Sequence, residues 1–194
     1  MATPFLQQAA WARVVFDLSV AAFGVGELSQ AVKWRRGASR ADLGGEVVFR
    51  LVFFVGVLML PLAQSRAPAA ELQGRGVFVL GAVVGWVGLL LRWWSFATLG
   101  RYFTTVVKTS ADQVVVSRGP YRFLRHPSYT GLLAAVLGCG LMLGNWVGVC
   151  TSFLLILSAL VYRLLREERA MIDAVGDAYL DFAKDRARLV PFVW

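Results

Sequence analysis

Long apolar stretches separated by short polar segments run along the whole chain. A stretch of roughly 20 mostly apolar residues is long enough to cross the hydrocarbon core of a bilayer as a helix. By this measure the pattern predicts about five transmembrane helices, at residues 11–32, 46–63, 76–99, 131–143 and 146–162. We therefore expect an all-α, polytopic integral membrane protein that forms one membrane domain over residues 1–194 and contains no internal repeat.

The last two apolar stretches are expected to form a helical hairpin. The fourth stretch is short and is followed by the dipeptide Gly144-Asn145, which is typical of a tight turn. The fifth runs on into polar residues without a helix breaker, and residues 171–194 then alternate apolar and charged positions. This alternation predicts a short amphipathic helix, with Ile172, Val175, Tyr179 and Phe182 on its apolar face, lying over a pocket or on the membrane surface.

Composition agrees with a membrane protein, because 58% of the residues are hydrophobic and only 16% are charged. The net charge of +8 could indicate nucleic acid, but the basic residues are segregated between the loops. They gather between stretches one and two, between three and four, and after stretch five: Lys33, Arg35, Arg36, Arg40, Arg101, Lys108, Arg118, Arg122, Arg125, Arg163, Arg166, Arg169, Lys184, Arg186 and Arg188. The opposite loops carry only Arg66 and Arg75.

This bias predicts an outside N-terminus and a cytoplasmic C-terminus. We further expect the membrane to be a bacterial-type inner membrane, with the active site facing the cytoplasm. Anionic lipid headgroups attract such loops, so no nucleic-acid partner is needed to explain the charge. Cys139 and Cys150 lie in apolar stretches without the spacing of metal ligands, and no metal is expected.

Charged and small residues within the apolar stretches have structural explanations. Glu27, Arg50 and Arg92 fall toward the predicted cytoplasmic ends of their helices, where they can pair with one another or with headgroups. Glycines recur at helical spacing in the third stretch, which predicts close approach of a neighbouring helix; they are Gly81, Gly85 and Gly88.

The first candidate for chemistry is the only histidine, His126, which stands between Arg125 and Pro127 just before the fourth stretch. The fixed φ of Pro127 suits the first turn of a helix, which leaves His126 immediately outside it. Tyr129 follows three residues later, close to the next turn on the same face.

A second polar cluster follows the fifth stretch and contains Arg163, Glu167 and Glu168. Arg163 and Glu167 are one helical turn apart and can pair. Since the hairpin brings the start of the fourth stretch and the end of the fifth to the same side, we expect His126 and these glutamates to meet.

An ordered set of short motifs covers roughly the C-terminal half of the chain. It consists of Leu99-Gly100-Arg101-Tyr102-Phe103, Gly119-Pro120-Tyr121, Arg125-His126-Pro127-Ser128-Tyr129-Thr130-Gly131, Asn145, Arg163, Glu167-Glu168, Gly176, Tyr179 and Arg188-Leu189-Val190-Pro191. This set resembles the isoprenylcysteine carboxyl methyltransferase family of integral membrane enzymes and its relatives among phospholipid N-methyltransferases. The resemblance implies a methyltransferase core over residues 76–194, preceded by two transmembrane helices within residues 1–75.

The resemblance also implies S-adenosylmethionine as the methyl donor, bound in a cytoplasm-facing pocket, and a lipophilic acceptor that enters from the bilayer. The residues expected around the cofactor are Tyr121, His126, Pro127, Tyr129, Glu167 and Glu168. Arg163 is expected to face the acceptor, so Arg163 and Glu167 are the candidate catalytic residues.

The sequence leaves several chemistries open. An isoprenylcysteine-like or other lipid carboxylate would need no general base, whereas a phospholipid amine or a thiol would need Glu167, Glu168 or His126 to accept a proton. An NADPH-dependent reductase of the sterol type is a second possibility. A non-enzymatic haem protein with His126 as an axial ligand is a third.

Overall fold

The computed structural model describes the chain except for residues 1–4, 35–42, 73, 101–114 and 192–193. The described elements are α1 (Phe5–Gln8), α2 (Ala10–Trp34), α3 (Leu43–Arg66), η1 (Pro68–Ala70), α4 (Arg75–Leu99), η3 (Gly119–Arg122), α5 (Pro127–Leu143), α6 (Trp146–Val175) and α7 (Asp177–Lys184). Within the described ranges the chain forms no β-strand, and its β pairing is limited to the isolated bridges Glu71–Asn145 and Leu124–Ala187. The prediction of an all-α fold is confirmed.

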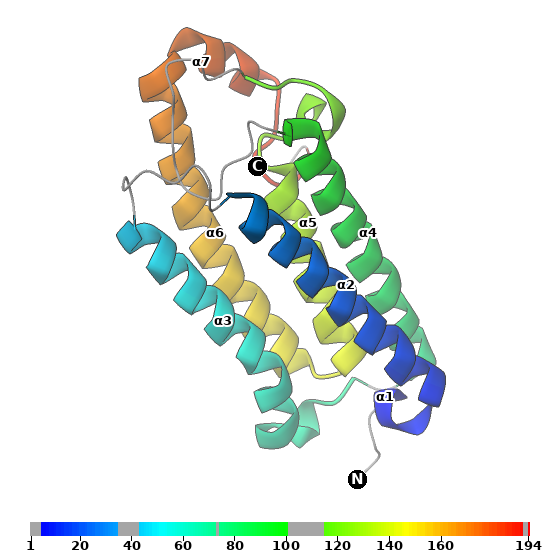
Figure 1. Cartoon of the computed structure of the whole chain (residues 1–194). Helices are drawn as coiled ribbons and strands as arrows, with labels where there is room; N and C mark the ends of the chain where they lie inside the picture. Colours follow the sequence, from blue (N-terminus) through cyan, green and yellow to red (C-terminus); the bar gives the residue numbers. More distant parts are fainter. Residues whose placement is uncertain (1–4, 35–42, 73, 101–114, 192–193) are drawn as a thin grey trace.

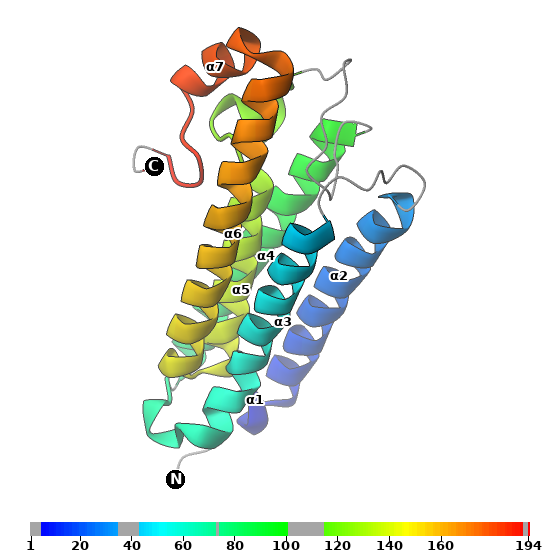
Figure 2. The same ribbon diagram turned by 90° about the vertical axis from the view of Figure 1, so that its left-hand side faces the viewer.

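The long helices form an antiparallel bundle (Figure 1). α4 and α5 pack most extensively, α6 packs on α5 and α3, and α2 contacts α4. Figures 1 and 2 place α7 and the start of α5 at one end of the bundle, and α1 with the α5–α6 turn at the other. We call the end that carries α7 the polar end of the bundle.

Among the residues that the structure describes, three helices are long and apolar enough to cross a membrane, within Val47–Arg66, Arg75–Leu99 and Trp146–Val175, and α5 is a shorter apolar helix of 17 residues. The protein is therefore an integral membrane protein, and the expectation of five crossings stays a prediction. The expected basic loop residues Arg35, Arg36, Arg40, Arg101 and Lys108 lie outside the described residues.

The predicted hairpin of α5 and α6 is confirmed. Gly144 closes α5 with a left-handed φ of 71°, and Asn145 begins α6 by accepting a hydrogen bond from the Gly148 amide at 3.0 Å through its side chain. The Asn145 amide group also donates to the Ala67 carbonyl at 2.9 Å, which ties the hairpin turn to the end of α3.

The predicted short amphipathic helix of the tail is present as α7, but it begins at Asp177 rather than near residue 171. α6 continues as far as Val175, where Gly176, with a φ of 53°, ends it and α7 begins in a new direction. Of the expected apolar face, Tyr179 and Phe182 are buried on α7 and Val175 packs against them from α6, whereas Ile172 is 38% exposed.

Glycines let α4 and α5 approach until their backbones touch. A Cβ added to Gly131 would lie 2.6 Å from the Gly88 carbonyl oxygen and 2.8 Å from the Arg92 nitrogen. The predicted role of the α4 glycines in close packing is thus confirmed.

The expected pairing within the membrane is confirmed for Arg92 and Glu27. The Nε and Nη2 atoms of Arg92 donate to the two Glu27 carboxylate oxygens at 2.5 and 2.8 Å. Its Nη1 donates to the Ser128 carbonyl at 2.9 Å, which anchors the first turn of α5 to α4.

Candidate active site

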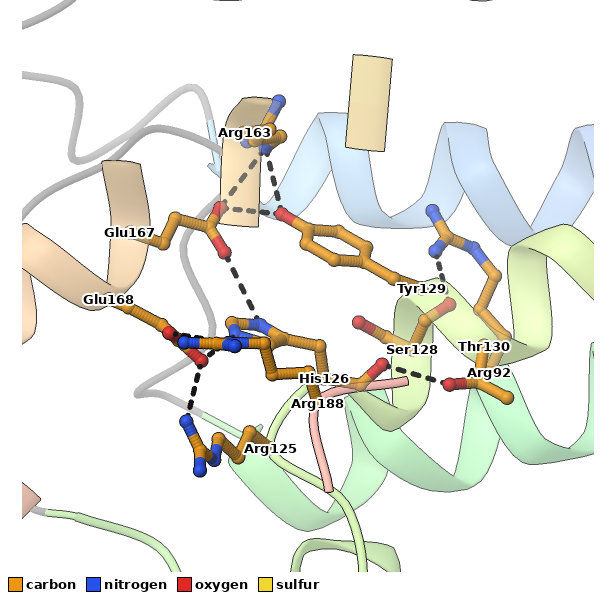
Figure 3. Close-up of polar contacts among 10 residues, drawn as sticks. All are labelled: Arg92, Arg125, His126, Ser128, Tyr129, Thr130, Arg163, Glu167, Glu168 and Arg188. Carbon is orange, nitrogen blue, oxygen red and sulfur yellow. Dashed lines mark hydrogen bonds and ion pairs between the residues drawn. The ribbon is translucent and has the colours of Figure 1, made fainter. Parts of the chain in front are cut away.

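The beginning of α5 positions the only histidine. Pro127 is the first residue of the helix and His126 precedes it, as the sequence predicts. The His126 amide donates to the Arg188 carbonyl at 3.1 Å, and its ring stacks on the Tyr129 ring with 5.5 Å between centroids and 6° between planes. These contacts fix the imidazole at the polar end of the bundle, where Figure 3 shows it between two glutamates.

One of these glutamates, Glu167, belongs to a three-residue network. The Tyr129 hydroxyl donates to Glu167 Oε1 at 2.5 Å, and Arg163 Nε donates both to the Tyr129 oxygen at 2.8 Å and to Glu167 Oε1 at 3.0 Å. The Arg163 guanidinium also lies over the Phe49 ring of α3, 4.7 Å from its centroid. The predicted Arg163–Glu167 pair is therefore present, and Tyr129 joins it.

The other glutamate, Glu168, is buried and surrounded by cations. Arg188 Nε donates to its Oε2 at 2.9 Å, and Arg125 Nη1 reaches its Oε1 at 3.3 Å. His126 Nε2 also lies 3.3 Å from Oε1, while His126 Nδ1 is 3.8 Å from Glu167. The imidazole thus bridges the two carboxylates, which are adjacent in sequence but bind different partners (Figure 3).

Tyr121 lies beside this polar cluster rather than within it. It packs with Tyr179, Phe182 and Ala183 in a small core between η3 and α7. Burial, and then the negative charge of Glu167, raises the pKa of Tyr121 above its ordinary value. Burial and the charge of Glu168 do the same to the pKa of Tyr179, so both phenols stay protonated at neutral pH.

The structure brings together five of the expected site residues: His126, Tyr129, Arg163, Glu167 and Glu168. Pro127 is fully buried and shapes the start of the helix rather than adding a polar group. Arg125 and Arg188 also belong to the cluster, although sequence reasoning gave them no role. Their presence in the motif set was the only signal, because Arg188 lies 20 residues from the carboxylate it binds.

This arrangement can hold a cation and an anion close together. The stacked rings of His126 and Tyr129 favour a positively charged group, and the two carboxylates add negative charge beside them, although each is already paired with an arginine. Arg163, at the junction with the apolar part of α6, favours a negative group. Such a site fits a reaction between a cationic donor and an anionic acceptor.

Comparison with known proteins finds similar sequences among membrane methyltransferases. Residues 80–173 match the sequence model of the isoprenylcysteine carboxyl methyltransferase (ICMT) family. The chain is 33% identical over 115 residues to protein-S-isoprenylcysteine O-methyltransferase A of Arabidopsis thaliana, covering 58% of each chain. It is 29% identical over 109 residues to the protein-S-isoprenylcysteine O-methyltransferase of Schizosaccharomyces pombe, covering 55% of this chain and 46% of that one.

A solved structure shares the fold. The eukaryotic intramembrane Ras methyltransferase ICMT superposes with a TM-score of 0.60 at 22% identity, over 79% of this chain and 55% of that chain. The chain thus spans about half the length of the curated relatives that it matches. The matched segment contains both the His126 motif and the two glutamates.

Proposed function

Since residues 80–173 match the sequence model of the isoprenylcysteine carboxyl methyltransferase family, we propose that the protein is a membrane methyltransferase that uses S-adenosylmethionine. The acceptor is the carboxylate of an isoprenylcysteine-like or other lipid that enters from the bilayer. The observation that carries this proposal is the convergence of His126, Tyr129 and both glutamates beside Arg163, at one end of apolar helices.

The side chains of the site suit S-adenosylmethionine. A sulfonium cation is favoured beside aromatic rings and carboxylates, which Tyr129, Glu167 and Glu168 provide. When bound, S-adenosylmethionine supplies an electrophilic methyl group. His126 lies between the two carboxylates, 3.3 Å from Glu168 Oε1 and 3.8 Å from Glu167 Oε2. Tyr121 and Pro127 would support this region from the side of η3 and the first turn of α5.

Arg163 is suited to the acceptor. It lies where the apolar part of α6 gives way to the carboxylates, and its guanidinium stacks between α6 and Phe49 of α3. A planar guanidinium can orient a carboxylate through two parallel hydrogen bonds. Because such a carboxylate has a reference pKa near 3.5, it is ionised at neutral pH and no residue needs to remove a proton. Positioning is then the main contribution of the chain.

We place this site on the cytoplasmic face of a bacterial-type inner membrane. The described basic residues support this orientation. Arg118 and Arg122 lie at η3, Arg125 just before α5, and Arg166 and Arg169 near the end of α6, and these elements meet at the polar end of the bundle (Figure 1). Arg66 ends α3 and Arg75 begins α4, at the other end.

The test is isotope transfer from S-adenosylmethionine carrying a labelled methyl group. The purified protein in nanodiscs is incubated in parallel with a prenylcysteine, with phosphatidylethanolamine and with a long-chain thiol. A carboxyl methyl ester releases labelled methanol in mild base, whereas a methylated amine or thiol keeps its label. The proposal expects base-labile label in the prenylcysteine or in a native lipid extract. Absence of transfer to every acceptor and to the extract would refute it, and base-stable label would refute the carboxylate assignment.

A further inference from the structure

Two arginines outside the Arg163–Glu167 network tie the end of α7 to the segment that precedes α5. Arg125 Nε donates to the Arg186 carbonyl at 2.8 Å, and its Nη2 donates to the Ala183 carbonyl at 2.6 Å. Arg186 makes the reverse connection, from the tail to η3 and α7. Its Nε donates to the Tyr121 carbonyl at 2.9 Å, and its Nη1 donates to the Phe182 carbonyl at 2.5 Å. We call Arg125 and Arg186 the tail clamp.

The tail clamp satisfies groups that a helix end leaves open. The last carbonyls of α7 have no partner within the helix and carry partial negative charge, so a guanidinium is favoured there. Backbone bonds accompany the arginines: the amides of Arg125 and His126 donate to the carbonyls of Ala187 and Arg188 at 2.8 and 3.1 Å. Residues 183–188 are therefore held along the stretch that leads into α5.

The clamped tail supplies one of the cations that bind Glu168. Arg188 follows the clamp by two residues and reaches Glu168 Oε2 at 2.9 Å. Arg125 donates from its remaining nitrogen, Nη1, to Glu168 Oε1 at 3.3 Å. The Arg125 side chain thus contacts both the tail and Glu168. If residues 183–188 moved away, Glu168 would lose Arg188, and the His126 amide would lose its acceptor.

We propose that Arg125 and Arg186 are positioning residues, which hold residues 183–188 against the start of α5 so that Arg188 fixes the Glu168 carboxylate for cofactor binding. This inference rests on the proposed function, since it assigns S-adenosylmethionine as the ligand of the site that the clamp completes. An opened clamp lowers the fraction of molecules that can bind, and the apparent dissociation constant rises in proportion. Bound cofactor restores the closed form, so turnover at saturation changes little.

The test compares Arg186→Lys and Arg125→Lys with Arg122→Lys in the full chain in nanodiscs. The Arg186 variant tests the clamp more selectively than the Arg125 variant. Among the described residues, the side chain of Arg186 donates to two backbone carbonyls and not to a carboxylate of the site. Arg122 is the matched control, an exposed arginine in the same segment whose guanidinium lies over the Phe123 ring at 5.9 Å. A lysine cannot reproduce the planar fork that reaches two carbonyls.

The rate of amide hydrogen exchange measures directly whether the clamp is closed. A peptide of residues 123–127 reports on Arg125 and His126, whose amides bond to the tail, because its first two residues lose their label and Pro127 has no amide hydrogen. In Arg186→Lys we expect these amides to exchange more than about tenfold faster, and S-adenosylmethionine to bind about tenfold more weakly, with turnover at saturation within roughly threefold of wild type. Arg122→Lys should match wild type in all three measurements.

Each outcome decides a separate point. Unchanged exchange in both clamp variants would overturn the clamp, whether or not the protein transfers methyl groups. Faster exchange with unchanged cofactor affinity, or turnover that falls as far as the affinity does, would overturn the positioning role. A folded wild-type protein that binds no S-adenosylmethionine would overturn the proposed function, while the exchange data would still report on the clamp. If Arg125→Lys fails to fold, Arg186→Lys decides alone.

Discussion

Truncation of Arg163 to alanine should separate handling of the acceptor from binding of the cofactor. Arg163 donates to Tyr129 and Glu167 through its Nε and stacks on Phe49. Its removal does not leave Glu167 without partners, because the Tyr129 hydroxyl still donates at 2.5 Å and His126 Nδ1 lies 3.8 Å away. We therefore expect S-adenosylmethionine affinity to change by less than about threefold.

The effect on methyl transfer should be much larger. If the guanidinium orients the acceptor carboxylate, its loss removes at least one charge-assisted hydrogen bond, worth about 1.5–3 kcal/mol. This corresponds to a fall of about 10- to 150-fold in kcat/KM for the acceptor. Arg163→Lys should recover only part of this loss, since an ammonium lacks the two parallel donors of a guanidinium.

The measurements are calorimetric titration with S-adenosylmethionine and turnover of labelled methyl groups, on the same purified samples. Arg166→Ala is the matched control, because Arg166 is an exposed arginine one turn along α6 that donates to the Tyr162 hydroxyl at 3.0 Å. Full activity in Arg163→Ala would show that this arginine is only the structural partner of Glu167. An equal loss of cofactor affinity and turnover would place it among the cofactor ligands instead.

Three further predictions concern the cofactor, the packing and the topology. His126→Ala and Glu168→Ala should each weaken S-adenosylmethionine binding more than about tenfold, as calorimetry would show, and unchanged affinity in both folded variants would exclude them from the cofactor site. Gly131→Val should lower the unfolding temperature or prevent folding, since overpacking costs about 1–3 kcal/mol or more where backbones touch. Gly24→Val is the control, because a Cβ there meets no atom within 4 Å. Equal unfolding temperatures of the two variants would contradict the packing of α4 on α5. Cysteines placed within residues 33–40 and in the C-terminal tail should be labelled from the same side of the membrane, and opposite labelling would reject the five-crossing topology.

Features that depend on residues close together in the sequence were accessible without the structure. The hydrophobic runs predicted the helices, Gly144 and Asn145 predicted the hairpin turn, and the spacing of four predicted the Arg163–Glu167 pair. Pro127 fixed the start of α5 and left His126 outside it. Each of these follows from helix geometry or from the fixed φ of proline, and both act within one or two turns.

Only the tertiary structure decided which partner each glutamate binds. Glu167 and Glu168 are neighbours, yet their side chains leave the helix about 100° apart, so one meets Tyr129 and Arg163 and the other meets His126 and Arg188. The choice depends on how deeply α5 sits against its neighbours and on the turn at Gly176 that brings the tail back.

The same reason explains why the tail helix begins later than predicted and why Tyr121 lies outside the polar cluster. Apolar spacing across residues 172–182 fits one continuous helix, but the left-handed φ of Gly176 redirects the chain, and Tyr179 and Phe182 then pack on Tyr121. Local periodicity determines which segments are helical. The pairing of groups tens of residues apart is determined by close packing and by the tail contacts, whose energies depend on the whole folded chain.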